Sequence, residues 1–184
     1  QADRLLIPRV LSLEDLATFG VLAAVVIAPF RTLQMGANFS LLPRLRAAED
    51  VEARRRILRR EALGLGLAVT LGSLLLLALA PWVFEWLFGD KFPITPALIL
   101  AAVVAGNARV LSGFAKGTAS ALCSSDQLRM LNPLTWLATG AAFAAGTFGA
   151  GWGLPGLVYG FALGWVTLAA VCAFQVRPHL RRSA

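Results

Sequence analysis

Five polar side chains stand inside stretches of sequence that are otherwise apolar, and their chemistry suits ligand binding. Arg31, Gln34 and Asn38 follow one another at spacings of three and four residues, which places them on one face of a helix. Arg109 and Lys116 are seven residues apart, so they also share a helix face. A cation within a membrane-spanning helix is costly unless something specific uses it. We therefore expect these residues to line a hydrated cavity.

The expected cavity is positively charged, because no Asp or Glu lies deep in the apolar stretches. A positive interior without fixed counter-ions favours a mobile anion as ligand. Arg31, Arg109 and Lys116 are the candidate substrate-binding cations, and Gln34 and Asn38 are candidate hydrogen-bonding groups. The alternative is structural. In it, Arg31 and Lys116 extend to the membrane surface from near their helix ends, and Arg109 pairs with a residue outside this sequence.

The stretches that carry these residues have the length of membrane spans. Hydrophobic residues make up 58% of the chain and charged residues 15%, and the mean hydropathy is +0.71. These values lie outside the range of soluble domains. Apolar runs of about 20 residues cross roughly 30 Å of hydrocarbon as helices. We predict an all-α, polytopic integral membrane bundle with about five transmembrane helices, over residues 17–42, 62–88, 96–122, 133–150 and 155–175.

Two of the helix starts carry strong local signals. Thr95 and Asn132 are capping residues, and each precedes a proline at what would be the first helical position. A proline there removes no helical hydrogen bond. We therefore expect helices to begin at Pro96 and Pro133.

Prolines and glycines inside the spans indicate how the helices bend and pack. Pro29 and Pro81 each remove a backbone hydrogen bond, so we expect kinks near them. Gly156, Gly160 and Gly164 repeat at four-residue intervals in the last span. This pattern predicts close packing against a neighbouring membrane helix.

A basic linker at residues 43–61 separates the first two spans. Between Arg44 and Glu61 it carries seven arginines and four acidic residues, and we expect a short amphipathic helix at the membrane surface. The candidate contacts with anionic lipid headgroups are Arg54, Arg55, Arg56, Arg59 and Arg60. An ordinary basic loop without lipid specificity explains the same charges and stays an alternative.

The distribution of basic residues predicts the orientation of the chain. Arg4, Arg9 and Lys91 fall on one side of the expected membrane. Eleven fall on the other: Arg44, Arg46, Arg54, Arg55, Arg56, Arg59, Arg60, Arg129, Arg177, Arg181 and Arg182. By the positive-inside rule the linker and the tail, residues 177–184, are cytosolic, and residues 89–95 face outward. Trp82, Trp86 and Trp152 are then expected at the outer interface.

Catalysis, metal binding and nucleic-acid binding lack their usual residues. The chain has one histidine, His179, no metal-spaced Cys and His cluster, and no phosphate-binding Gly-Lys loop. We expect no enzyme activity, no cofactor and no metal. The net charge of +7 comes mainly from the linker rather than from a groove interleaved with aromatics, so we expect no nucleic-acid partner. Cys123 and Cys172, expected near the cytosolic face, predict no disulfide.

Short motifs along residues 3–175 resemble those of one superfamily of membrane exporters. The motifs are Asp3-Arg4-Leu5-Leu6-Ile7 at a helix end, Leu41-Leu42-Pro43-Arg44 at the end of a span, Leu87-Phe88-Gly89-Asp90-Lys91-Phe92 in the outer loop, and Gly149-Ala150-Gly151 between the last two helices. Together they resemble the C-terminal half of Wzx-type polysaccharide flippases. These flippases belong to the MATE-like superfamily of multidrug, lipid-linked oligosaccharide and polysaccharide exporters.

The resemblance implies that residues 1–176 are the C-terminal bundle of a two-bundle transporter whose N-terminal bundle lies outside this sequence. The absence of an initiator methionine before Gln1 agrees with this expectation. The implied activity is movement of an undecaprenyl-diphosphate-linked glycan across a bacterial inner membrane. Cavity cations of such families hold the diphosphate, which is the role inferred above for Arg31, Arg109 and Lys116.

Two other functions fit parts of the sequence. A multidrug cation antiporter of the same superfamily would carry a buried carboxylate, which these spans lack. A non-transporting membrane scaffold would use the arginine-rich linker to recruit anionic lipid or a cytosolic partner. Loss of surface glycan on replacing Arg109 separates the flippase from the scaffold.

Overall fold

A computed structural model of the chain describes residues 11–181, without the side chains of residues 90 and 181, and this part is all-helical. Arg4, Arg9 and Arg182 and the first resembling motif, residues 3–7, lie outside it. The elements in chain order are α2 (Leu13–Leu22), a π-helical turn (Ala23–Ile27), α3 (Ala28–Ala47), α4 (Val51–Phe88), a 3-10 turn (Gly89–Lys91), α5 (Pro96–Leu122), α6 (Ser125–Gly149), a second 3-10 turn (Ala150–Trp152) and α7 (Gly153–Arg181).

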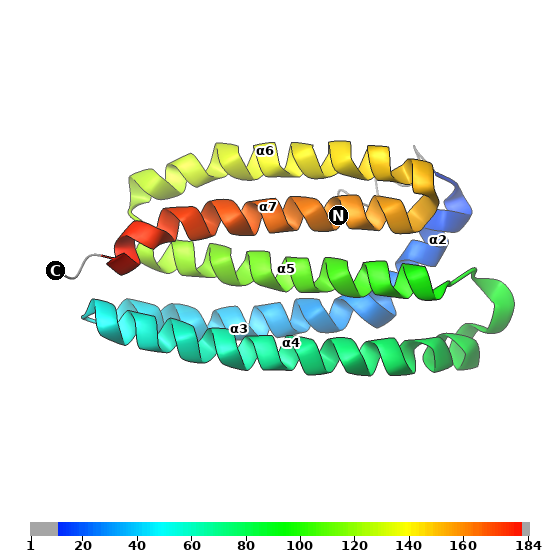
Figure 1. The fold of residues 1–184 in the computed structure, drawn as a ribbon, viewed down its shortest axis with the longest axis horizontal. Helices are drawn as coiled ribbons and strands as arrows, with labels where there is room; N and C mark the ends of the chain where they lie inside the picture. The colour runs from blue at the N-terminus through cyan, green and yellow to red at the C-terminus, as the bar shows by residue number, and fades with distance from the viewer. Residues whose placement is uncertain (1–10, 182–184) are drawn as a thin grey trace.

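The long helices lie along one axis, with α5 between the α3–α4 pair and the α6–α7 pair (Figure 1). α5 packs against both α7 and α3, and α6 packs against α7. α4 is the most peripheral helix: only Ser73, Ala80 and Phe84 of its residues are buried. The central position of α5 means that its polar residues face neighbouring helices rather than one open surface.

Four helical stretches in the described part are long and apolar enough to cross a membrane: Leu13–Ala47, Val51–Phe88, Pro96–Leu122 and Ser125–Leu180. The expected number was about five. The difference lies in the last stretch, where the 3-10 turn at Ala150–Trp152 joins α6 to α7 with scarcely a break in helical backbone. Figure 1 shows that these two helices run in opposite directions, side by side. The described part of the chain is a helical bundle whose long helices could cross a membrane.

One of the two predicted helix starts is correct. The Thr95 hydroxyl accepts a hydrogen bond from the Leu98 backbone N–H at 3.3 Å, and α5 begins at Pro96. The start predicted at Pro133 is wrong, because α6 begins at Ser125 and Pro133 lies inside it. Ser124 and Gln127 form a capping box that satisfies free N–H groups of the first turn, so the helix begins eight residues earlier than predicted and contains the proline.

The basic linker is not a separate helix. α3 extends to Ala47, and after a short turn α4 runs without interruption for 38 residues. At about 1.5 Å per residue α4 is about 57 Å long, well above the roughly 30 Å of a bilayer core. Asp50 caps its start by accepting from the Ala53 N–H. The five candidate lipid-contacting arginines therefore occupy the first three turns of a helix that is long and apolar enough to cross a membrane.

The bend predicted near Pro29 takes the form of a π-helical turn. Pro29 lies in the first turn of α3, directly after Ala23–Ile27, and the Ala28 N–H bonds to the Ala23 carbonyl five residues earlier. Figure 1 shows that the helix changes direction between α2 and α3. A widened turn of this kind relieves the clash that the proline ring makes with the preceding backbone.

The glycine stripe of the last span packs as predicted. Gly156, Gly160 and Gly164 all face α6, where a Cβ added to Gly160 would lie 2.5 Å from the backbone of Ala145. Such close approach is possible only because these positions lack side chains. The two helices therefore form one tight hairpin.

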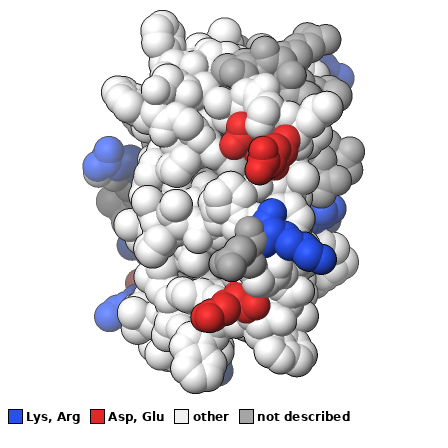
Figure 2. Space-filling view, turned by 90° about the vertical axis from the view of Figure 1, so that its right-hand side faces the viewer, with Lys and Arg blue, Asp and Glu red and all other residues white. Residues whose placement is uncertain are grey.

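The two ends of the bundle differ in charge. The end that holds the α4–α5 and α6–α7 turns is largely uncharged, with separate acidic and basic groups (Figure 2). Trp82, Trp86 and Trp152, predicted at an outer interface, are 79%, 83% and 83% exposed and belong to this end. The opposite end carries the arginines of the α3–α4 turn together with Arg129 and Arg177.

Candidate anion-binding pocket

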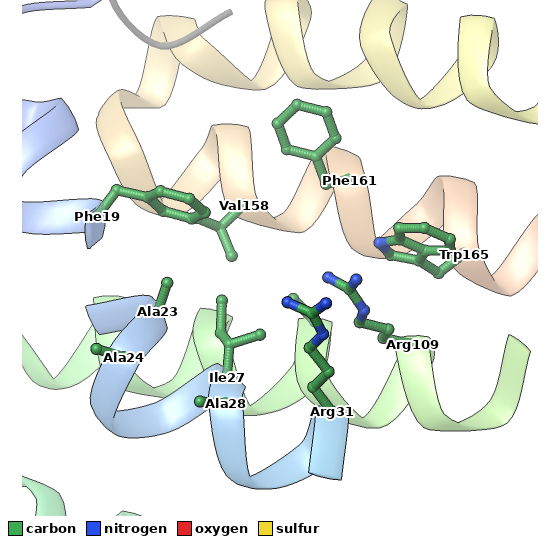
Figure 3. A pocket seen from close by; sticks show the side chains of 11 residues that line it. Phe19, Ala23, Ala24, Ile27, Ala28, Arg31, Arg109, Val158, Phe161 and Trp165 are labelled. Carbon is green, nitrogen blue, oxygen red and sulfur yellow. The ribbon is translucent and has the colours of Figure 1, made fainter. Parts of the chain in front are cut away.

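A pocket of about 240 Å³ lies where the π-helical turn, α5 and α7 meet. Two arginines, Arg31 from α3 and Arg109 from α5, supply its charge. In Figure 3 both guanidinium groups extend toward α7. The other lining side chains are apolar or aromatic: Phe19, Ala23, Ala24, Ile27, Ala28, Ala105, Val158, Phe161 and Trp165.

Helix packing sets the level of Arg31 in the bundle. Phe30, the preceding residue, packs against Gly106 of α5, and Gln34 packs against Gly113. Arg31 therefore lies at the level of the middle of α5, next to Arg109. Its side chain is exposed and makes no hydrogen bond or ion pair with any residue in the range 11–181. The guanidinium donors are available to a ligand.

Arg109 occupies the middle of α5, midway between Pro96 and Leu122. Either helix end is about 20 Å away along the axis. The side chain is partly buried, and its guanidinium carbon lies 5.3 Å from the centre of the Trp165 ring. This cation–π contact holds the head group in the pocket.

Acidic side chains are absent from the described lining of this pocket. Glu85, which lies near the end of α4, lines a different cavity with Phe92 and Pro96. Glu61 pairs with Arg44 at 2.6 Å, on the arginine-rich side of the bundle. The charged side chains in the described lining of the pocket are therefore both basic.

Lys116 does not share the pocket with Arg109. It is exposed and lines a separate cavity of about 410 Å³ with Asn132 and Thr135 of α6 and Cys172 of α7. Seven residues of an α-helix come to within about 20° of two full turns, so the two side chains do point in similar directions. They are two turns apart, however, and the neighbours of α5 change over that distance. The shared cationic stripe expected from the sequence is divided between two cavities.

Gln34 and Asn38 lie in the contact between α3 and α5 rather than in the pocket. Gln34 covers Gly113, and a Cβ added to Gly117 would lie 2.6 Å from the Asn38 Oδ1. That oxygen is buried and has no hydrogen-bond partner in the described part of the chain. Both side chains therefore lie outside the pocket of Arg31 and Arg109, because they pack against the glycine face of α5.

Sequence reasoning missed the aromatic wall of the pocket. Trp165 and Phe161 of α7 line it, and Trp165 contacts Arg109. The available signal was a tryptophan in the middle of a span, away from the interfaces where membrane proteins place this residue most often.

The arginines of α4 divide into two that are hydrogen-bonded and three that have no hydrogen bond in the described part of the chain. The Arg54 Nε donates to the Ala48 carbonyl at 3.1 Å, and the Arg55 Nε donates to the Leu180 carbonyl at 2.7 Å. Arg56, Arg59 and Arg60 are exposed. Cys123 and Cys172 are free thiols, as expected, and no group of three or more metal-binding side chains occurs in the described range.

Comparison with known proteins adds no relative: no protein-family model, no curated protein and no solved structure matches the chain.

Proposed function

We propose that the protein is a membrane flippase that moves an anionic, diphosphate-linked lipid oligosaccharide from one leaflet to the other. The observation that supports this most strongly is the convergence of Arg31 and Arg109 in one pocket at the middle of the bundle. Guanidinium groups are planar donors that bind phosphate oxygens in pairs. Two of them suit a ligand with two adjacent phosphates.

The apolar surroundings of the two arginines strengthen their attraction for such a ligand. Ions interact more strongly where water is excluded and the local dielectric constant is low. Trp165 orients Arg109, and Phe161 adds a second aromatic surface next to it. In the proposed mechanism the diphosphate enters this pocket, the glycan stays in the hydrated space, and the lipid tail stays in the bilayer.

Transport requires the pocket to open toward each side of the membrane in turn. We propose that this bundle rocks against a second bundle of the same transporter, around a site near the membrane midplane. No covalent bond is made or broken. The proposed setting is a bacterial inner membrane, with the arginine-rich end cytosolic, as the excess of arginine there favours.

A transport assay tests the proposal. The full-length protein is reconstituted in vesicles with a fluorescent polyprenyl-diphosphate disaccharide, and the fraction of probe reaching the inner leaflet is followed by adding an impermeant quencher. We expect Arg31→Gln and Arg109→Gln to slow transport at least about 10-fold, the loss of one charge-assisted contact. The control Arg46→Gln removes an exposed arginine at the end of α3, the helix that carries Arg31. It lies outside the pocket and should leave the transport rate unchanged.

The same assay distinguishes the competing functions. Wild-type rates in both pocket variants would overturn the flippase proposal. An antiporter would instead move an organic cation such as ethidium, and inorganic pyrophosphate would not compete with it. A non-transporting scaffold would move neither probe.

A further inference from the structure

A larger hollow runs along the outside of the bundle between α4, α5 and α7. Its volume is about 980 Å³, and it shares no lining residue with the pocket of Arg31 and Arg109. Its surface is almost wholly apolar and includes Leu111 and Phe114 of α5 and Phe174 of α7. Small side chains such as Ala170 leave the space open. We refer to it as the α4–α7 groove.

The polar side chains of the α4–α7 groove gather at its arginine-rich end. Arg55 and Arg59 stand four residues apart on α4, and Arg177 approaches from the last turns of α7. Arg55 is held by its hydrogen bonds to the Leu180 carbonyl. Arg59 and Arg177 are exposed and have no ion-pair partner in the part of the chain that the structure describes. No described acidic side chain lines the groove.

The dimensions of the groove match one membrane leaflet. Its lining on α7 extends from Val166 to Leu180, which is about 21 Å at 1.5 Å per residue. One leaflet of a typical bilayer contributes about 15 Å of hydrocarbon and several more of headgroup. An apolar channel of this length with cations at one end complements an amphiphile with an apolar tail and an anionic head.

We propose that the α4–α7 groove binds one anionic phospholipid, with its phosphate at Arg59 and Arg177 and an acyl chain along Phe114, Ala170 and Phe174. The bound lipid fills the gap beside α4, the helix with the smallest buried share of its residues, and joins it to α7. This site is separate from the proposed transport pocket and does not depend on it. A helix of another protein would fill the apolar part equally well, but it would leave the arginines of the rim without a phosphate.

The test compares lipid binding to variants of the full-length protein by native mass spectrometry. The probes are phosphatidylglycerol and phosphatidylcholine with identical acyl chains. In Arg59→Ala/Arg177→Ala we expect phosphatidylglycerol affinity to fall about 30-fold, from the contribution of two basic residues to anionic-lipid binding. Ala170→Trp fills the groove without changing the charge, and it should abolish binding of the first lipid molecule.

The matched control is Arg46→Ala/Arg129→Ala. It removes two exposed arginines from the same end of the bundle, and neither lines the groove. Its affinity for phosphatidylglycerol should stay within about threefold of wild type, which is less than one basic residue contributes. Each variant must keep the wild-type helical content and elution volume to be compared.

Two results would overturn the proposal. An equal loss of affinity in the control and the rim variant, with lipid retained by Ala170→Trp, would mean diffuse attraction to a basic surface. A lipid-free dimer that dissociates on Ala170→Trp would mean that a second copy of the chain occupies the groove.

Discussion

Replacing Gly160 with Ala should push α6 and α7 apart, because the two backbones are in contact at this point. The added Cβ would lie 2.5 Å from the carbonyl carbon of Ala145 and 2.5 Å from the backbone nitrogen of Gly146. Ordinary contact between carbon atoms is about 3.5–4.0 Å. The obstructing atoms belong to helix backbone, so no change of rotamer relieves the overlap. The helices must separate by about 1 Å.

The expected cost follows from two opposing effects. Overpacking of a close contact costs about 1–3 kcal/mol, and the rigid backbone at Gly160 places it at the upper end of that range. The greater helix propensity of Ala over Gly returns about 1 kcal/mol. We expect the free energy of unfolding to fall by about 2 kcal/mol. The bulkier Gly160→Leu should prevent the α6–α7 hairpin from packing.

The measurement is reversible unfolding in mixed micelles with increasing sodium dodecyl sulfate, followed by circular dichroism. The matched control is Gly140→Ala, on the other face of α6, where an added Cβ has no atom within 4 Å. This variant should be as stable as the wild type or slightly more stable. If Gly160→Ala and Gly140→Ala unfold at the same detergent fraction, the inferred backbone contact is wrong.

Three further predictions concern a helix contact, a helix cap and a cysteine. Gly117→Ala should destabilise the protein by about 1 kcal/mol, because the added Cβ displaces Asn38. Adding Asn38→Ala in the same chain should restore stability. Additive effects in the double-mutant cycle would contradict the contact between Gly117 and Asn38. Thr95→Ala removes the cap of α5 and should cost about 1 kcal/mol in the same unfolding assay, and no change would mean that the cap is dispensable. Burial raises the pKa of the Cys123 thiol, so in a Cys172→Ala background its maleimide labelling should be slow at neutral pH and still increase above pH 9, the ordinary pKa. An impermeant maleimide should reach Cys123 in inverted membrane vesicles and not in intact cells, and the reverse pattern would contradict the proposed orientation.

Local signals in the sequence predicted the helices well. Pro96 and Leu122 bound α5 as expected, because a threonine cap with a following proline is a strong start signal. At Pro133 the same reasoning failed. The competing capping box at Ser124 lies eight residues earlier and leaves the proline in the helix interior, where its missing hydrogen bond is tolerated.

The position of the candidate site depended on helix packing, which one-dimensional periodicity does not contain. Spacing alone placed Arg109 and Lys116 on one face, and it grouped Arg31 with Gln34 and Asn38. The glycine face of α5 is where side chains of α3, including Gln34 and Asn38, pack. Lys116 lies further along α5, where the neighbouring helix is α6. Nothing in the spacing of residues indicates where a third helix lies.

The continuous α4 helix shows why the prediction of a separate linker helix was wrong. Residues 43–61 have the composition of a surface linker, and charge made a separate amphipathic helix the natural expectation. Helix propensity favours continuation instead, because arginine, leucine and alanine dominate the junction near Glu61 and no proline or turn interrupts it.

The central claim is that Arg31 and Arg109 act together on one anion, and a double-mutant cycle of ligand binding tests it most directly. Calorimetric titration of the protein with farnesyl diphosphate would give the dissociation constants of wild type, Arg31→Gln, Arg109→Gln and the double variant. Each single change should weaken binding by about 10- to 150-fold, the equivalent of 1.5–3 kcal/mol for a charged hydrogen bond. We predict a coupling energy between the two changes of at least about 1 kcal/mol. Unchanged affinity in the single variants, or losses that simply add, would contradict the account.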